Sequence, residues 1–352
     1  MPNSLRAAVI GTGAISKEHL SFIANSPLAQ LVGVCDLSRI AGQYAAKRFG
    51  AEACFTNYQD MLKAVSPEVI HILTPPQTHP RIAADCLKAG AHVICEKPIT
   101  LSYLEFKDLW EVAKECDRTL IEDQNYRFNE PVLQIQKLIQ DGTLGEIQDV
   151  EIRLALDIRG GRFDDENLPN PIHKMPAGVI HDFITHMTYL ALCFIPDLEF
   201  GKVSSHWSNH GGSPLYKYDD LDALVIDGSR HARLRFSCFT QPDAFQITVR
   251  GTRGFAETDL FLPYVRCVVP RSGGKQLSPL INHFESGKEL MGASFRNFRR
   301  KIMQKTPYEG LHRLMGMTYE ALLRGEAPPI SFDDMARTSR FIDALLLEEN
   351  HR

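Results

Sequence analysis

Short apolar runs alternate with longer amphipathic stretches through the first third of the chain. The runs have the length of buried strands, and the stretches between them repeat with helical period. Strands that alternate with helices predict a parallel sheet covered by helices on both faces, the doubly wound Rossmann arrangement of an α/β protein. The expected strands are 7–10, 31–35, 68–74, 91–95 and 119–122, and the expected helices are about 17–25, 38–49, 80–88 and 102–116.

The pattern changes after residue 123, where long alternating segments replace the short apolar runs. Alternation of apolar and polar residues is typical of strands with one buried face. We therefore predict a Rossmann domain at 1–123, followed by an α/β domain at 124–352 with an open, mostly antiparallel sheet. The C-terminal helix is a candidate for packing back on the first domain. The expected strands are 148–158, 201–207, 222–226, 232–240, 245–250 and 264–269, and the expected helices are 130–141, 179–194, 284–304, 307–324 and 332–349.

A glycine turn follows the first expected strand, and an acid ends the second. Gly11 allows a sharp turn, and Gly13 has no Cβ to block a pyrophosphate at the N-terminus of the next helix. Asp36 is placed to accept hydrogen bonds from an adenosine ribose. A carboxylate repels a 2′-phosphate, so the predicted cofactor is NAD. Ser38 and Arg39 could instead hold that phosphate, and NADP stays open.

Two further segments come directly after expected strands, Thr74-Pro75-Pro76-Gln77-Thr78-His79 and Glu96-Lys97-Pro98. Ligands of parallel sheets bind beyond the carboxyl ends of the strands, so both segments belong to the crevice of the glycine turn. The predicted cofactor-binding residues are Gly11, Gly13, Ala14, Ile15, Asp36, Ser38, Arg39, Thr74, Pro75, His79, Glu96, Lys97 and Asn125.

The expected helix at 179–194 has a polar face that lacks lysine, glutamate and arginine. That face consists of His181, Asp182, Thr185, His186 and Tyr189. A solvated helix face is the ordinary alternative, but such faces usually carry the long charged residues. Asp182 and His186 are four residues apart and therefore neighbours on the helix. An imidazole beside a carboxylate favours a partly enclosed polar cavity.

Composition and charge exclude several classes of protein. The chain has 352 residues, of which 44% are hydrophobic and 23% charged, with a formal net charge of −4. These values fit a globular enzyme and give no reason to expect nucleic acid or an anionic membrane as partner. The basic run 296–301 is interpreted as a solvated helix face. No stretch has the apolar length of a membrane span, and the N-terminus lacks a signal-peptide core.

The cysteines and histidines argue against structural metal and disulfides. The eight cysteines form no CxxC pair, which favours buried thiols in a reducing cytoplasm. His206 and His210 have ligand-like spacing, but no acidic or thiol partner stands near them in the sequence. We therefore predict no metal and a cytoplasmic location.

Five segments follow one another along the chain: GTGAISKEH, VIHILTPPQTH, AGAHVICEKP, NYRFNEPVLQIQKLIQDGTLGEI and GVIHDFITHMTYL. Together they resemble the glucose–fructose oxidoreductase / inositol dehydrogenase / rhizopine-catabolism (Gfo/Idh/MocA) family of NAD(P)-dependent oxidoreductases. The likeness is close over residues 5 to about 195 and only general beyond. It implies that the open sheet makes subunit contacts, in a homodimer or homotetramer, and that Lys97, Asp182 and His186 face the nicotinamide.

The resemblance implies an enzyme that moves a hydride between nicotinamide and a secondary alcohol or ketone. His186 would carry the proton, Lys97 would stabilise alkoxide charge, and Asp182 would orient His186 or a substrate hydroxyl. The loop 159–176 would line the substrate pocket, where its arginines could meet a phosphate or carboxylate. The expected substrate-binding residues are Lys97, Tyr126, Arg127, Arg159, His173, Asp182 and His186.

The substrate class and the catalytic status have alternatives. A sugar, cyclitol or sugar nucleotide is expected, and segment 284–325 resembles relatives from surface-polysaccharide pathways, which favours the sugar nucleotide. A non-sugar such as a diol or tetrapyrrole is a second option. A non-catalytic dinucleotide-binding sensor or regulator on the same fold is a third. Lys97 and His186, whose loss is expected in such a sensor, are both present.

Overall fold

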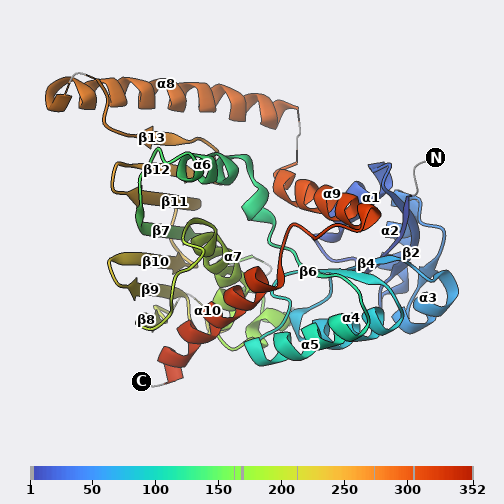
Figure 1. Cartoon of the computed structure of the whole chain (residues 1–352). Helices are drawn as coiled ribbons and strands as arrows, with labels where there is room; N and C mark the ends of the chain where they lie inside the picture. The colour runs from blue at the N-terminus through green and yellow to red at the C-terminus, as the bar shows by residue number, and fades with distance from the viewer. Residues whose placement is uncertain are drawn as a thin grey trace. The chain divides into compact units, whose positions relative to one another are not determined.

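The computed structural model describes residues 4–161, 163–167, 170–211, 213–272, 274–303 and 306–350 (Figure 1). The chain forms two compact units. Unit 1 comprises Met1–Asn125 with Tyr308–Arg340, and unit 2 comprises Tyr126–Pro307 with Phe341–Arg352.

The sheet of unit 1 has the strand order β3-β2-β1-β4-β5-β6, and all of its neighbouring strands pair in parallel. This is the order of a doubly wound Rossmann sheet, so the predicted fold class is confirmed. The strands are β1 Leu5–Ile10, β2 Ala29–Cys35, β3 Cys54–Phe55, β4 Val69–Ile72, β5 His92–Cys95 and β6 Leu120–Glu122. The helices between them are α1 Ser16–Asn25, α2 Arg39–Phe49, α3 Tyr58–Val65, α4 His79–Lys88 and α5 Tyr103–Glu115.

Two of these elements, β3 and α3, are not predicted from the sequence. β3 has two residues, too few to show a hydrophobic pattern, and Met61 is the fully buried side chain of α3. Met61 packs against β2 at Gly33, where an added Cβ would lie 3.1 Å from the methionine sulfur. The small residue at position 33 therefore lets this polar helix approach the sheet closely.

A C-terminal segment completes unit 1. Helix α9, Glu309–Arg324, buries Tyr319 in the core beside Val9, Leu20 and Val69. The Tyr319 hydroxyl lies 2.9 Å from Nε2 of His71 in β4. The predicted division assigned all of 124–352 to the second domain, whereas 308–340 packs with the first unit because the apolar face of α9 covers the sheet beside α1.

Unit 2 contains the second sheet, with the order β13-β12-β11-β7-β10-β9-β8. β7 and β10 pair in parallel and the other neighbouring pairs are antiparallel, as predicted for this sheet. β12 was not expected, because its sequence GFAETD is short and begins with glycine. The strands are β7 Ile147–Ala155, β8 Val203–Ser208, β9 Asp220–Asp227, β10 Arg230–Ser237, β11 Ala244–Gly251, β12 Gly254–Asp259 and β13 Arg266–Val268.

The helices of this part are α6 Glu130–Gln140, α7 Val179–Phe194 and α8 Gly274–Ile302, and α10, Phe332–Asn350, runs from unit 1 into unit 2. Helix α7 packs on β7 and β10. Its Phe183 stacks on Phe236, with ring centroids 5.4 Å apart.

The opposite face of this sheet carries charged residues in cross-strand pairs. Arg233 binds Asp222 at 2.7 Å, and Arg250 binds Asp149 at 2.6 Å. Apolar residues such as Leu234 alternate with these arginines and point toward α7. In the part of the chain that the structure describes, no helix is long and apolar enough to cross a membrane.

Candidate functional site

The glycine turn joins β1 to α1. Gly11 has a φ of 96°, and a Cβ at this position would lie 2.7 Å from the Leu73 carbonyl oxygen, so glycine is required there. A Cβ at Gly13 would meet no atom within 4 Å. The turn is closed by Ser16, whose hydroxyl donates to the Gly13 carbonyl at 2.7 Å. The open space at Gly13, at a helix N-terminus, fits a pyrophosphate.

Asp36 holds the glycine turn in place from the end of β2. Its Oδ2 accepts hydrogen bonds from the Thr12 backbone N–H at 2.8 Å and from the Thr12 hydroxyl at 2.6 Å. Its Oδ1 accepts from the Ser38 N–H at 2.7 Å. A carboxylate can accept further bonds, so this clamp is compatible with the predicted ribose contact. The predicted residue list omitted Thr12.

The two residues proposed to hold a 2′-phosphate differ in their surroundings. The Ser38 side chain caps α2 by accepting from the Ala41 N–H at 3.3 Å, which occupies one of its lone pairs. Arg39 is exposed. Leu37 is 95% exposed and Ile40 82% exposed, on either side of this pair in the sequence. Exposed apolar side chains next to Asp36 suit a flat base, and they were not predicted because a single leucine after a strand has no distinctive pattern.

His79 connects the two segments that were expected at the sheet's carboxyl edge. The ring is fully buried, with Nε2 2.7 Å from the Thr74 carbonyl and Nδ1 2.9 Å from the Pro98 carbonyl. Burial lowers the pKa of this imidazole. His79 therefore joins the Thr74 and Pro98 carbonyls as an internal brace, at a position where we expected a cofactor contact.

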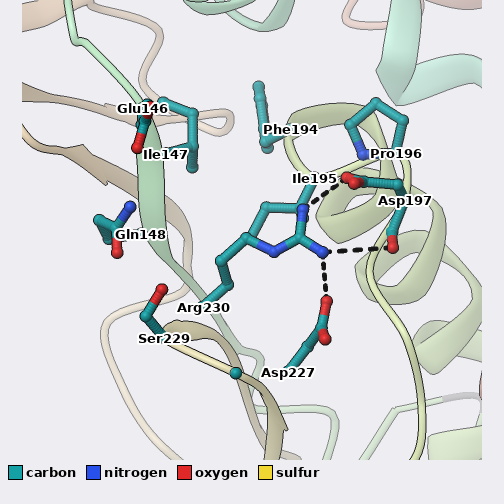
Figure 2. Close-up of a pocket in the computed structure, with 11 residues that line it drawn as sticks. Glu146, Ile147, Gln148, Phe194, Ile195, Pro196, Asp197, Asp227, Ser229 and Arg230 are labelled. Carbon is teal, nitrogen blue, oxygen red and sulfur yellow. Dashed lines mark hydrogen bonds and ion pairs between the residues drawn. The ribbon is translucent and has the colours of Figure 1, made fainter.

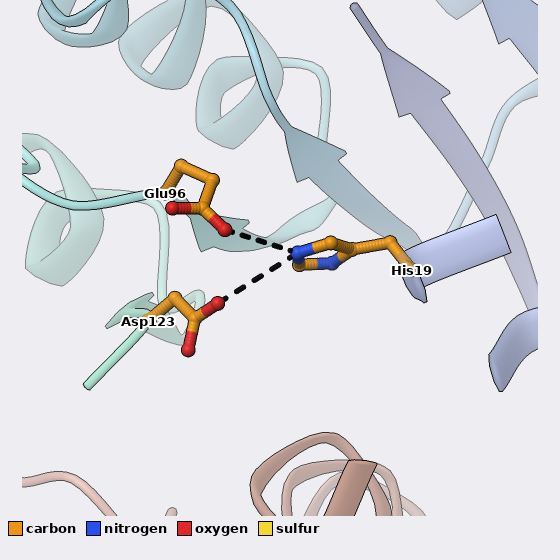
Figure 3. Close-up of side chains that lie close together, drawn as sticks. All are labelled: His19, Glu96 and Asp123. Carbon is orange, nitrogen blue, oxygen red and sulfur yellow. Dashed lines mark hydrogen bonds and ion pairs between the residues drawn. The ribbon is translucent and has the colours of Figure 1, made fainter. Parts of the chain in front are cut away.

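Glu96, the residue before Lys97, belongs to a buried polar cluster. His19 of α1 has its Nε2 3.2 Å from Oε1 of Glu96 and 3.7 Å from Oδ2 of Asp123 (Figure 3). Its Nδ1 lies 2.8 Å from Nδ1 of His71, whose Nε2 contacts the Tyr319 hydroxyl. The chain of contacts runs from α1 through β4 to α9. The sequence analysis missed it because these residues are far apart along the chain.

The carboxyl groups of this cluster have opposite pKa shifts. Burial and the neighbouring Glu96 charge raise the pKa of Asp123 well above its usual value. Burial alone would raise the pKa of Glu96, but the His19 hydrogen bond and the positive charges of His19 and Lys97 lower it overall. The opposite shifts favour a proton on Asp123 over one on Glu96. Burial keeps His71 neutral by lowering its pKa.

The same cluster has the ligand types of a small cation site. One ligand atom from each of His19, Glu96 and Asp123 can be chosen so that all lie within 4.8 Å of one another. A proton on Asp123 could compensate the two neighbouring carboxyl groups as well as a bound cation could. The absence of a metal stays a prediction.

In unit 2, the polar face of α7 is buried. His181, Thr185 and Tyr189 are inaccessible to solvent or nearly so, and His186 is 9% exposed. Nδ1 of His186 lies 2.7 Å from the Tyr189 hydroxyl, which also accepts from the Tyr126 N–H at 3.3 Å. The Tyr126 ring meets the imidazole edge-on, with centroids 4.8 Å apart. The imidazole is therefore held between two tyrosines, and the face is not a solvated one.

Tyr189 was placed on the polar face from the sequence, but its role as the partner of His186 was not foreseen. Its spacing of three residues from His186 was the available signal. Asp182 is half-buried in the first turn of α7, and its orienting role stays a prediction. Tyr126 and Arg127 lie in the 3-10 turn Asn125–Phe128, and Asn125 is buried.

The arginine expected to bind substrate has a protein partner. Arg159 makes two hydrogen bonds to Asp157, from Nε at 2.8 Å and from Nη2 at 2.7 Å. These bonds lower the pKa of Asp157 to about 2. Asp157 thus compensates the charge of the exposed guanidinium, and the binding of substrate by Arg159 stays a prediction. Arg162 lies outside the described residues, and His173 stacks on Tyr216 with centroids 5.8 Å apart.

An open pocket of about 510 Å³ lies elsewhere in unit 2, between the end of α7 and the β9–β10 turn (Figure 2). Arg230 extends into it and pairs with Asp197 and Asp227. Two carboxylates compensate this guanidinium. None of the predicted site residues lines this pocket, so it is separate from the candidate chemistry.

The comparisons with known proteins agree with the geometry of unit 1. Residues 5–124 match the family described as "Oxidoreductase family, NAD-binding Rossmann fold" (GFO_IDH_MocA). D-glucoside 3-dehydrogenase of Escherichia coli (strain K12) is 32% identical over 144 residues, which are 41% of this chain and 41% of that protein. The matches to the next two curated relatives span 49% and 61% of their lengths.

Solved structures of this oxidoreductase fold superpose on almost the whole chain. Levoglucosan dehydrogenase in complex with NADH and levoglucosan has a TM-score of 0.81 at 19% identity, covering 99% of this chain and 98% of that one. The WlbA dehydrogenase from Bordetella pertussis, in complex with NADH and UDP-GlcNAcA, has a TM-score of 0.79 at 17% identity, covering 99% and 96%. At these identities the likeness establishes the fold.

Proposed function

We propose that this protein is an NAD-dependent oxidoreductase that interconverts a secondary alcohol and a ketone on a sugar or cyclitol. The observation that carries the proposal is the clamped imidazole of His186, one of whose nitrogens is held by a buried tyrosine. An imidazole held in this way is a suitable proton carrier near neutral pH. The Rossmann family of residues 5–124 supplies the cofactor class.

The residues of unit 1 fit the dinucleotide. The space at Gly13 accommodates a pyrophosphate, and Asp36 offers carboxylate oxygens to the ribose while holding the turn through Thr12. The same negative charge disfavours a 2′-phosphate, which supports NAD over NADP. Bound nicotinamide would accept the hydride from the alcohol carbon or return it to the ketone.

His186 moves the proton in this proposal. If its Nδ1–H donates to the Tyr189 hydroxyl, Nε2 is the unprotonated nitrogen of the ring and is the atom proposed to take the proton of the alcohol. In the reverse direction, Nε2–H returns that proton to the developing alkoxide. Tyr189 thereby selects the tautomer that can act as a base.

Lys97 is proposed to stabilise negative charge that develops on the substrate. Its ammonium group donates a hydrogen bond whose strength increases as the alkoxide forms. Glu96, the residue before it, contacts His19, with Oε1 3.2 Å from Nε2 of the imidazole. Asp182 is proposed to orient a substrate hydroxyl.

The names of the relatives support a sugar-like substrate. A D-glucoside 3-dehydrogenase is similar in sequence over part of the chain, and a levoglucosan dehydrogenase has the same fold. The WlbA dehydrogenase, which also has this fold, was crystallised with a sugar nucleotide. We propose a sugar nucleotide as the narrower class. Arg159 does not add to this choice, because Asp157 already pairs with it.

Turnover distinguishes an enzyme from a sensor. Nicotinamide absorbance at 340 nm would be followed with NAD(H) and NADP(H) against sugars, cyclitols, sugar nucleotides and diols. Turnover of a sugar-class substrate with NAD supports the proposal. Binding of NAD and a sugar ligand with no turnover in either direction would establish the sensor instead.

A further inference from the structure

Helix α8 has its polar and apolar faces reversed relative to an ordinary surface helix. The buried face is formed by Asn282, Ser286 and Ala293. Asn282 donates to the Val269 carbonyl at 2.7 Å, and Arg266 of β13 donates to the Ser286 hydroxyl at 3.0 Å. Polar contacts therefore attach this helix to the edge of its own sheet, next to β13 (Figure 1).

The face that points away from β13 is apolar. Its residues recur at alternating steps of four and three, the heptad spacing of a coiled-coil contact. Lys288 occupies the remaining position of the series, with its ammonium 5.7 Å from the Phe284 ring centroid. We call this row the α8 seam, which consists of Leu277, Ile281, Phe284, Lys288, Met291, Phe295, Phe298 and Ile302.

The seam is larger than the apolar patches of ordinary monomers. Phe284, Phe295 and Phe298 are 67%, 72% and 65% exposed. A phenylalanine side chain has roughly 150–250 Å² to bury, so these three rings alone expose on the order of 400 Å². The largest apolar patch on a typical monomer is about 300–600 Å² in total. With its leucine, isoleucine and methionine side chains, the seam approaches the roughly 800 Å² per partner of a stable interface.

We propose that the α8 seam binds the α8 seam of a second copy of this chain, in an antiparallel pair about a two-fold axis. In the register that aligns the full length of both helices, Phe284 faces Phe295 of the second copy and Ile281 faces Phe298. Leu277 faces Ile302 in the same register. The seam is thus complementary to itself, as a two-fold interface requires.

Charge selects the antiparallel direction. Arg299, Arg300 and Lys301 lie in the last turn of α8. A parallel pair would place two such basic ends side by side, whereas the antiparallel pair separates them and places each beside the N-terminal half of the other helix. That half carries Lys275 and Lys288 besides Glu285, so the antiparallel direction is favoured because it separates the two basic ends.

The same charges argue against an anionic membrane as the occupant. A membrane-surface helix has basic residues along a polar face that borders its apolar face. In α8 the polar face is attached to β13, and the middle of the helix carries Glu285 and Glu289. The α8 seam is a different surface from the open face of the sheet, where the resemblance implies a subunit contact, and that contact stays a prediction.

Substitutions that introduce opposite charges at two facing positions of the seam test the proposal. The association of the full chain is measured by sedimentation equilibrium. Phe284→Lys and Phe295→Glu should each raise the dissociation constant of the α8 contact by roughly 100-fold, since buried aromatic anchors dominate interfaces and each occurs twice in the pair. An equimolar mixture of the two variants should reassociate, because the introduced lysine of one copy would then face the introduced glutamate of the other. Leu104→Glu, at a side chain that is likewise 67% exposed but lies in α5, should leave the mass unchanged.

Three results would overturn the proposal. One is a wild-type mass that neither substitution changes. Another is a mixture that stays dissociated, which rejects the antiparallel register. The third is a monomeric wild type, including one that binds phosphatidylserine vesicles. Circular dichroism checks folding, and Phe284→Ala with Phe295→Ala replaces the charged pair if either variant is unfolded, with a smaller expected increase of roughly 10-fold.

Discussion

Replacing Tyr189 by phenylalanine separates the stabilising role of this tyrosine from its proposed role in proton transfer. The substitution removes the hydroxyl that lies 2.7 Å from Nδ1 of His186 and accepts from the Tyr126 N–H. Both ends of the contact are buried, so the free energy of unfolding should fall by about 1–3 kcal/mol. Tyr319→Phe is the matched control, because it removes an equally buried hydroxyl from a histidine, His71, in unit 1.

The catalytic effects of the two variants should differ. A hydrogen bond of about 1–2 kcal/mol favours the base-competent tautomer of His186 by a factor of roughly 5–30. Tyr189→Phe should therefore lower kcat by about that factor and displace the pH–rate profile, with KM for NAD nearly unchanged. Tyr319→Phe should lose similar stability and keep wild-type kcat.

Urea unfolding measures the stability term, and steady-state rates between about pH 5 and 9 measure the catalytic one. The reasoning is refuted if both variants lose stability but share one kcat at every pH. It is also refuted if Tyr319→Phe lowers kcat as much as Tyr189→Phe, because the effect would then report general loosening of the fold.

Three further perturbations probe the dinucleotide site and the buried histidine. Gly13→Val should abolish NADH binding in a folded protein, because the side chain fills the pyrophosphate space; calorimetry showing undiminished affinity would reject this assignment. Asp36→Ala should weaken NADH binding and bring the dissociation constants for NADH and NADPH closer together. An unchanged ratio of these two constants would contradict the prediction. His71→Asn should reduce the loss of stability in acid. Burial lowers the His71 pKa in the folded state, so its contribution is full above the unfolded pKa near 6.5 and is lost as the pH falls below it. The difference between the free energies of unfolding at pH 7.5 and pH 5.5, measured with urea, should shrink by up to about 1.4 kcal/mol in the variant, and an unchanged difference would contradict the prediction.

Periodic, local patterns allowed most of the fold to be predicted. Helix α7 has the predicted bounds, Val179–Phe194, because its apolar stripe is long and unbroken. β3 and β12 were missed because each is too short or too glycine-rich to show alternation. The packing of α9 in unit 1 depends on Tyr319 meeting His71 across most of the chain length, which no local pattern encodes.

The candidate site was predictable where spacing carries the information. Gly11, Gly13 and Asp36 follow from the strand–turn–helix order, and the structure adds the Thr12 clamp that depends on side-chain rotamers. His79 has the sequence position of a ligand contact but is buried under two carbonyl groups. Arg159 is exposed but forms an ion pair with Asp157, two residues away. The sequence alone does not show this pairing.

The most direct test of the proposed mechanism is the rate of hydride transfer in His186→Asn, followed as nicotinamide absorbance with the best substrate found for the wild type. General acid–base groups contribute roughly 10²- to 10⁴-fold to rate, so kcat should fall by that range while the dissociation constant for NADH stays within about twofold. A variant that matches the wild-type kcat at every pH would contradict the assignment of His186 as the proton carrier.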